Sequence, residues 1–333
     1  MSGRLSIQPL GASGLQRIAV TGANGFVGRA LCAALAARGV EVTALVRAAV
    51  PIPGATRVQT VGDFTAVSDW KPWLAEIDAV AHLAALTHAG TRGADAARFH
   101  AVNVEVSRRL AEAARACGIQ RFVYLSSIKV NGESSTRAHG GVHAFSASDT
   151  PAPEDDYGRS KLATEQLLAQ LCGKDVGALT ILRPPLVYGP GQQGNLPRLM
   201  TLVARELPLP FGALTNRRSL IYVENLVAAI VNALGVASPG VRCYTVADVE
   251  VSTPALVRVL AHGLGVQAHL LNVPPSLLRA LTCLPGVGAS VRRLTDNLLV
   301  DARAAERELG WHPHIAFEDA IALTCSAWRE ARR

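Results

Sequence analysis

A glycine-rich segment near the start of the chain constrains the fold more than any other feature. The segment TGANGFVG, residues 21–28, follows a short apolar stretch, Arg17–Val20, and opens an Ala- and Leu-rich stretch of helical character, Phe26–Arg38. Its three glycines allow a tight turn, close approach of a pyrophosphate to backbone amides, and tight packing of the helix on the sheet. The glycine spacing is GxxGxxG. The alternative interpretation is a glycine-rich turn that binds no ligand. Its position between a strand and a helix favours a dinucleotide-binding turn.

Strand-like and helical segments alternate after this turn. Further strands are predicted at 40–46, 77–83, 121–126 and 179–182, and helices at 95–117 and 158–171. This alternation is typical of an α/β fold, with a Rossmann-type, doubly wound parallel sheet. Beyond residue 189 we expect Pro-interrupted helices with little strand character, except for one strand at 243–246 that returns to the sheet.

Composition argues against several classes of protein. Hydrophobic residues make up 49% and charged residues 18% of the chain, a composition typical of a globular protein. The net charge is +7, but Lys and Arg are spread along the chain, so we expect an anionic small substrate and no nucleic acid. The six cysteines lack metal-ligand spacing, and prolines and Arg279 interrupt the apolar stretch 270–291, so neither a metal site nor a membrane span is expected. With no signal peptide in the first sixteen residues, the cytoplasm is the expected location.

The end of the second predicted strand indicates the cofactor. Arg47 stands where a carboxylate would bind the adenosine ribose of NAD, and an arginine there can pair with the 2′-phosphate of NADP. NADP is therefore favoured, with NAD and a solvated arginine as the alternative. Asp63, after the third strand, is placed to accept a hydrogen bond from the adenine amine, unless it only forms a turn.

Tyr157-Gly-Arg-Ser-Lys161 is a YxxxK motif, which places a phenol and an ammonium on one helical face. Free tyrosine has a pKa of about 10. A neighbouring Lys⁺ and an oxidised nicotinamide are both expected to lower it, so that Tyr157 can exchange the proton of a carbinol. Ser126 and Ser127 end the strand at 121–126, where a serine can bond to a carbonyl beside the nicotinamide; a strand-capping pair is the alternative.

These motifs together resemble the extended short-chain dehydrogenase/reductases, in the NAD-dependent epimerase/dehydratase family that acts on nucleotide sugars. The matching segments are TGANGFVG, HLAA (82–85), Asn103, SS-x-K-V-N-G (126–132), YGRSK, RPPLVYGPG (183–191), RRSLIYVENL (217–226) and ELGWHP (308–313). Within the family, the chain looks most like reductases of 4-keto-6-deoxy N-acetylated UDP-hexoses.

The resemblance implies a role for each matching position, in a homodimeric enzyme. The catalytic residues would be Ser127, Tyr157 and Lys161. The cofactor would be bound by Gly22, Asn24, Gly25, Phe26, Val27, Gly28, Arg47, Asp63, Leu83, Ala84, Ala85, Asn103, Tyr157, Lys161 and Pro184. The nucleotide-sugar substrate would meet Thr87, Ser127, Asn195, Leu196 and Arg218, of which Asn195 matches a nucleotide-contacting Asn and Arg218 a diphosphate-binding Arg.

Two departures from the family pattern bear on the reaction. Leu186 replaces an Asn that many members carry, and Ile128-Lys129 replaces the Asp-Glu pair of the dehydratases, so elimination of water is not expected. We predict an NADP-binding Rossmann domain over 16–188, with a returning segment near 219–247, and a smaller C-terminal substrate lobe over 189–218 and 248–333. The expected reaction is NADP(H)-dependent reduction of the C4 keto group of a UDP-linked deoxy sugar. A 4-epimerase with tightly held NAD and a catalytically silent NADP-binding regulator are the alternatives.

Overall fold

A seven-stranded parallel sheet forms the centre of the structure. The computed structural model describes residues 15–87, 95–136, 141–172, 177–280 and 288–332. The strands lie in the order β3-β2-β1-β4-β5-β6-β9, and every neighbouring pair is parallel. Their bounds are β1 (Arg17–Thr21), β2 (Glu41–Val46), β3 (Arg57–Thr60), β4 (Ala79–His82), β5 (Arg121–Leu125), β6 (Ala178–Arg183) and β9 (Gly240–Thr245). The predicted Rossmann-type sheet is thereby confirmed.

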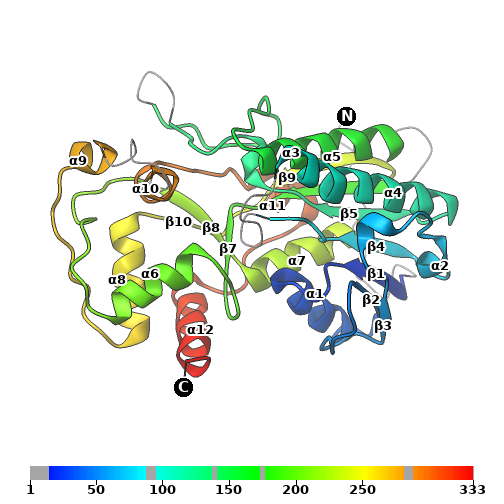
Figure 1. Cartoon of the computed structure of the whole chain (residues 1–333), viewed down its shortest axis with the longest axis horizontal. Coiled ribbons are helices and arrows are strands. Elements are labelled where there is room, and N and C mark those ends of the chain that lie inside the picture. Colours follow the sequence, from blue (N-terminus) through cyan, green and yellow to red (C-terminus); the bar gives the residue numbers. More distant parts are fainter. Residues whose placement is uncertain (1–14, 88–94, 137–140, 173–176, 281–287, 333) are drawn as a thin grey trace.

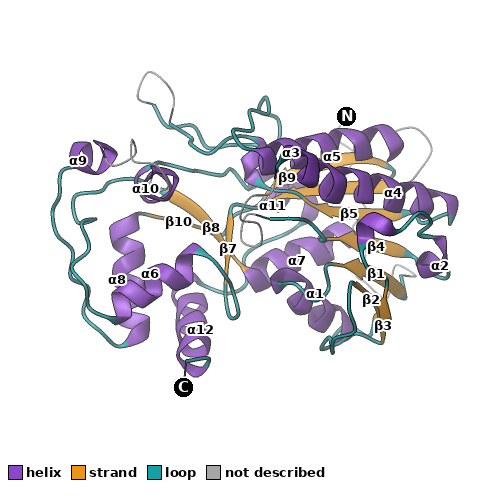
Figure 2. Cartoon of the chain, in the orientation of Figure 1, coloured by secondary structure: helices purple, strands orange, loops and turns teal. Residues whose placement is uncertain are grey.

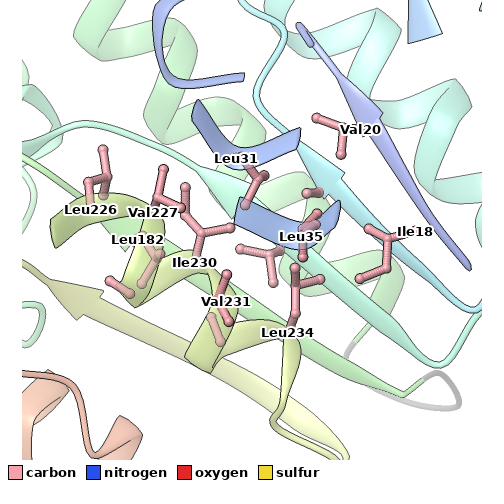
Figure 3. Packing of buried hydrophobic residues seen from close by; sticks show 14 of the residues in the cluster. Ile18, Val20, Leu31, Leu35, Leu182, Leu226, Val227, Ile230, Val231 and Leu234 are labelled. Carbon is pink, nitrogen blue, oxygen red and sulfur yellow. The ribbon is translucent and has the colours of Figure 1, made fainter. Parts of the chain in front are cut away.

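Helices cover both faces of this sheet (Figure 2). On one face lie α1 (Phe26–Ala36) and α7 (Val223–Leu234), which pack against each other. Figure 3 shows Leu31 and Leu35 of α1 beside Ile230 and Leu234 of α7, with Ile18 of β1 to the right of Leu35. These side chains are almost completely buried. Because helices cover both faces of the sheet, its strands are buried on both sides, which explains their strongly apolar sequences.

The opposite face carries a long helical segment and the helix of the YxxxK motif. The first consists of α3 (Ala96–Phe99), a π-helical turn η3 (His100–Glu105) and α4 (Val106–Ala116), where the sequence predicted one regular helix. The second is α5 (Asp156–Cys172), and its Leu168 packs in the same core as Leu110 of α4. Short helices η1 (Phe64–Ala66) and α2 (Lys71–Leu74) precede β4.

A second group of elements lies to one side of the large sheet (Figure 1). Its three-stranded sheet has the order β10-β8-β7, formed by β7 (Leu186–Tyr188), β8 (Arg218–Tyr222) and β10 (Val249–Val251). Around it lie α6 (Asn195–Ala204), α8 (Thr253–Leu264), α9 (Pro275–Ala280), α10 (Gly288–Thr295) and α12 (Phe317–Glu330), while α11 (Arg303–Leu309) contacts α7 and β9. Beyond residue 189, β9 is the predicted returning strand, whereas β8 and β10 were not predicted.

The chain passes between the two groups more than once. After β6 it enters the small sheet at β7, and after β8 it returns through α7 and β9 to the large sheet. The domain boundaries proposed from the sequence stay a prediction. No helix in the described ranges has the length and apolar character needed to span a membrane.

Candidate active site

The glycine-rich turn lies at the point where the strand order reverses, between β1 and β4. Gly22 has φ +69°, and a Cβ there would lie 2.8 Å from the backbone nitrogen of Ala84. A Cβ on Gly28 would lie only 2.1 Å from the Gly22 carbonyl oxygen, so both positions require glycine. Helix α1 begins at Phe26 with no acidic residue in its first turn and no cap from any described side chain. Its N-terminal amides are thus suited to a pyrophosphate.

A buried hydrogen-bonded chain holds the loop after β4 against this turn. The Thr21 hydroxyl is 2.7 Å from His82 Nδ1 and accepts the Ala84 N–H at 3.2 Å. His82 Nε2 lies 2.7 Å from the Ser107 hydroxyl of α4. Burial lowers the pKa of His82 to about 3, so its ring is neutral. Sequence reasoning placed His82 only within a matching segment and did not detect this role.

Asn103 lies in the π-helical turn and joins the same loop to α5. Its Oδ1 accepts the Leu86 N–H at 2.7 Å, and its Nδ2 donates to the Leu86 carbonyl at 3.2 Å and to the Ser160 hydroxyl at 2.9 Å. Since these protein contacts use both ends of the amide, Asn103 holds the loop after β4 in place. Its predicted direct contact with the cofactor stays a prediction.

Ser127, Tyr157 and Lys161 meet at the carboxyl end of β5. Ser127 opens a 3-10 turn, η4 (Ile128–Val130), and its hydroxyl is hydrogen-bonded to Tyr157. Lys161 is buried, and its Nζ donates to the Leu125 carbonyl at 2.8 Å and lies 5.9 Å from the centre of the Tyr157 ring. The structure therefore brings together the three residues predicted to be catalytic.

Burial sets the ionisation of both titratable groups in this cluster. It raises the pKa of Tyr157 well above the usual tyrosine value; the hydrogen bond from Ser127 opposes the rise and the charge of Asp155 adds to it. Burial also lowers the pKa of Lys161 to about 7, against the attraction of Glu165. Tyr157 therefore carries its proton at neutral pH, as a general acid must. The expectation that Lys161 and an oxidised nicotinamide together lower the pKa of Tyr157 stays a prediction.

A buried ion pair under the cluster was not predicted from the sequence. Glu165 and Arg183 have side chains 6% exposed, and two hydrogen bonds join them, at 2.5 and 3.0 Å. Glu165 also accepts the Ser126 hydroxyl at 2.5 Å, and Arg183 donates to the Asn131 side chain at 3.1 Å. The pair thus fixes the residue next to Ser127. Only the position of Arg183 in a matching segment gave any signal for it.

The adenosine side of the predicted cofactor site follows β2 and β3. Arg47 directly follows β2 and is exposed. Asp63 accepts both the N–H and the hydroxyl of Thr65 at 2.9 Å, so it forms the turn that opens η1. Arg47 lies close enough to lower the pKa of Asp63 further. The adenine contact of Asp63 stays a prediction.

The remaining predicted cofactor residues surround the glycine turn. Asn24 and Gly25 are exposed, while Phe26 and Val27 are half-buried and pack against the core beside α8. Leu83 and Ala85 are half-buried beside Ala84. The Pro184 carbonyl accepts the Ile128 N–H at 2.9 Å, which places the end of β6 against the Ser127 turn.

The predicted substrate residues lie mostly in the second group of elements. Asn195 is exposed at the start of α6, but Leu196 is 2% exposed and packs in the core with Met200. Its side chain therefore stabilises the fold, and only its backbone remains available to a substrate. Leu186 at the start of β7 is 39% exposed, and Thr87 is exposed at the end of a described segment.

Arg218 belongs to a group of charges between β8 and α10. It donates to the Asp296 carbonyl at 3.0 Å, and burial lowers its pKa to about 10. Asp296 and Glu133 attract it, while Arg293 repels it. The contact of Arg218 with a diphosphate stays a prediction.

Comparison with known proteins decides the family. The sequence profile described as the NAD dependent epimerase/dehydratase family matches residues 18–246. The chain belongs to this family. The predicted family, fold and enzymatic nature are thereby confirmed.

Three relatives of this epimerase/dehydratase match almost its whole length. UDP-glucose 4-epimerase of Vibrio cholerae is 35% identical over 319 residues, which cover 94% of this chain and 96% of that protein. The 2-alkyl-3-oxoalkanoate reductase of Stenotrophomonas maltophilia is 29% identical over 331 residues, covering 92% and 97%. The structure of MoeE5 in complex with UDP-glucuronic acid and NAD has a TM-score of 0.76 at 26% identity, covering 95% of this chain and 99% of that one.

Proposed function

We propose that this epimerase/dehydratase reduces the C4 keto group of a UDP-linked deoxy sugar with NADPH, and that Tyr157 is the general acid. One observation carries this proposal: a protonated Tyr157, hydrogen-bonded to Ser127 and one helical turn from a buried Lys161, at the carboxyl end of β5. In sheets of this type, ligands bind at that edge, near the reversal of strand order where the glycine turn lies.

The residues present fit a dinucleotide. Gly22 and Gly28 let the turn pack tightly against the Ala84 backbone and the start of α1, whose amides would then bind the pyrophosphate. The Ala84 loop and Pro184 would flank the nicotinamide. When bound, NADPH supplies the hydride that adds to the carbonyl carbon. Tyr157 gives its phenolic proton to the carbonyl oxygen, Ser127 hydrogen-bonds to that oxygen, and Lys161 binds the nicotinamide ribose. The hydride and the Tyr157 proton together would convert the ketone to an alcohol.

Several observations support a nucleotide sugar as substrate. Arg218 and Arg293 are near enough for Arg293 to affect the pKa of Arg218, so both could supply positive charge to a diphosphate, and Asn195 is exposed at the start of α6. The name of the Vibrio cholerae relative and the ligand of MoeE5 both refer to UDP-sugars. The exposed Leu186 suits a less hydroxylated sugar face. Lys129 stands where a dehydratase has a carboxylate, which argues against elimination.

A UDP-sugar 4-epimerase is the second candidate, and the 35% identity to the Vibrio cholerae enzyme favours it. An epimerase returns the hydride to its substrate, so it retains its cofactor and needs no added NADPH. A reductase releases oxidised cofactor in each cycle. We therefore expect one NADPH consumed per product when a UDP-4-keto-6-deoxy-N-acetylhexosamine is added. Interconversion of UDP-4-hydroxyhexoses without net NADPH consumption would establish the epimerase instead.

Cofactor choice depends on Arg47 in this proposal. Arg47→Asp is expected to weaken NADPH binding much more than NADH binding, because it replaces a cation by a carboxylate beside the 2′-phosphate. Arg57→Asp is the matched control, since Arg57 is exposed at the opposite end of the neighbouring strand β3. Fluorescence titration with each cofactor measures the four affinities. Equal losses for NADPH and NADH in Arg47→Asp would show that Arg47 does not contact the phosphate.

A further inference from the structure

Lys129 lies two residues after Ser127 and connects the Ser127 turn to the start of α5. Its Nζ donates to the Asp155 carboxylate in close contact and to the Glu133 carboxylate at 2.7 Å. Its backbone N–H points to the Ser127 hydroxyl oxygen at 3.3 Å. A single lysine thus meets two carboxylates directly beside one of the proposed catalytic residues.

Asp155 transmits this contact to the helix that carries Tyr157. Its other carboxylate oxygen accepts the Gly158 N–H at 2.7 Å, and so it caps the first turn of α5. The two backbones also touch here, because a Cβ on Gly158 would lie 2.8 Å from the Lys129 carbonyl oxygen. Any movement of Asp155 would therefore shift Tyr157 relative to the Ser127 turn.

Lys129 also pairs with the negative charge of Asp155 beside Tyr157. The carboxylate of Asp155 raises the pKa of Tyr157, since a nearby negative charge disfavours the phenolate. The side chains of Lys129 and Asp155 are 21% and 24% exposed, so solvent screens their interaction less than on an open surface. The groups that face Tyr157 are Ser127 from the turn, Asp155 directly before α5, Lys161 from α5 and Tyr124 from β5. Lys129 reaches this set through Asp155.

Lys161, the second lysine beside Tyr157, contacts other groups. Its Nζ donates to the Leu125 carbonyl and lies 4.6 Å from the centre of the Tyr124 ring. Lys129 Nζ, in contrast, donates to the Asp155 carboxylate. Lys129 therefore meets the carboxylate at the start of α5 directly.

We propose that Lys129 is a positioning residue of the acid/base site: its ammonium holds Asp155 at the start of α5 and balances the carboxylate charge beside Tyr157. This inference rests on the proposed function only in that it assigns Tyr157 the proton transfer. The proposal assigns a function to Lys129, which stands where the dehydratases have a carboxylate.

Tyrosine ionisation tests this without any substrate. Phenolate absorbance is followed as pH rises in the complex with oxidised cofactor, and the signal of the matching Tyr157→Phe protein is subtracted. Lys129→Met removes the cation at similar length, so Asp155 is left unbalanced and the midpoint should rise by about one pH unit. Lys129→Arg keeps the charge and should restore the midpoint. Asp155→Asn should lower it, because asparagine still caps Gly158 but carries no charge.

Three comparisons decide the outcome. Arg159→Gln breaks an exposed pair with Asp156 in the same helical turn and should leave the midpoint unchanged. The double variant Lys129→Met/Asp155→Asn should return towards Asp155→Asn, because the lysine then has no charge to balance. A lower melting temperature in Lys129→Met without a change of midpoint would overturn the proposal, as would equal midpoints for Lys129→Met and Lys129→Arg.

The design separates this inference from the proposed function. If the protein turns over no keto sugar, the titration still reports on Lys129. If Lys129→Met does not fold, Asp155→Asn alone decides, and an unchanged or higher midpoint in that variant contradicts the proposal. If the titration shows no effect while Tyr157→Phe abolishes turnover, only the role of Lys129 is wrong.

Discussion

Tyr157→Phe is expected to reduce turnover by about 10²–10⁴-fold, the usual contribution of a general acid or base. The substitution deletes only the hydroxyl that carries the exchangeable proton, so cofactor affinity should stay nearly unchanged. Steady-state kinetics with NADPH and a UDP-4-keto sugar give the first quantity, and fluorescence titration with NADPH gives the second.

Tyr188→Phe is the matched control for this substitution. The Tyr188 side chain is completely buried beside Tyr222 and Phe317, and its hydroxyl has no hydrogen-bond partner in the described part of the chain. Loss of that hydroxyl should leave turnover near the wild-type value. Near-normal activity in Tyr157→Phe would show that another group supplies the proton.

Glu165→Ala is expected to lower the free energy of unfolding by about 3–5 kcal/mol, because it leaves a buried guanidinium without its counter-charge. Both partners of the Glu165–Arg183 pair are 6% exposed, and Ser126 loses its acceptor in the same variant. Urea denaturation measures the loss.

The exposed pair of Arg108 and Glu112 on α4 provides the comparison. Their side chains are 33% and 46% exposed, so Glu112→Ala should cost at most about 1 kcal/mol. If Glu165→Ala cost no more than Glu112→Ala, the buried pair would not stabilise the site. The account of how Ser127 is held in place would then be wrong.

The large sheet could be predicted from the sequence because its signals are local. Apolar runs such as Ile18–Val20 alternate with helical segments, and the glycine turn marks their first junction. The small sheet lacked such signals. Strands β7 and β10 have three residues each, too few for a pattern, and their pairing with β8 joins residues about thirty positions apart. The π-helical turn likewise follows from contacts of Asn103 across the fold.

The proposed catalytic residues could be predicted because the order and spacing of Ser127, Tyr157 and Lys161 are visible in the sequence. The rise of the Tyr157 pKa could not be predicted, because a sequence shows neighbouring charges but does not show burial. Arg183 and Glu165, eighteen residues apart, gave no sign of pairing. The same holds for Lys129 and Asp155, which are separated by twenty-six positions.

The central claim, net hydride transfer to C4, is tested most directly by an isotope. The protein is incubated with a UDP-4-keto-6-deoxy-N-acetylhexosamine and NADPH that carries deuterium at the transferred position, and the product is analysed by mass spectrometry and NMR. We predict a product with deuterium bound to C4 and an equal amount of oxidised cofactor. Recovery of the keto sugar unreduced with the labelled NADPH intact, while a UDP-4-hydroxyhexose in a parallel incubation changes configuration at C4 without gaining deuterium, would contradict the claim.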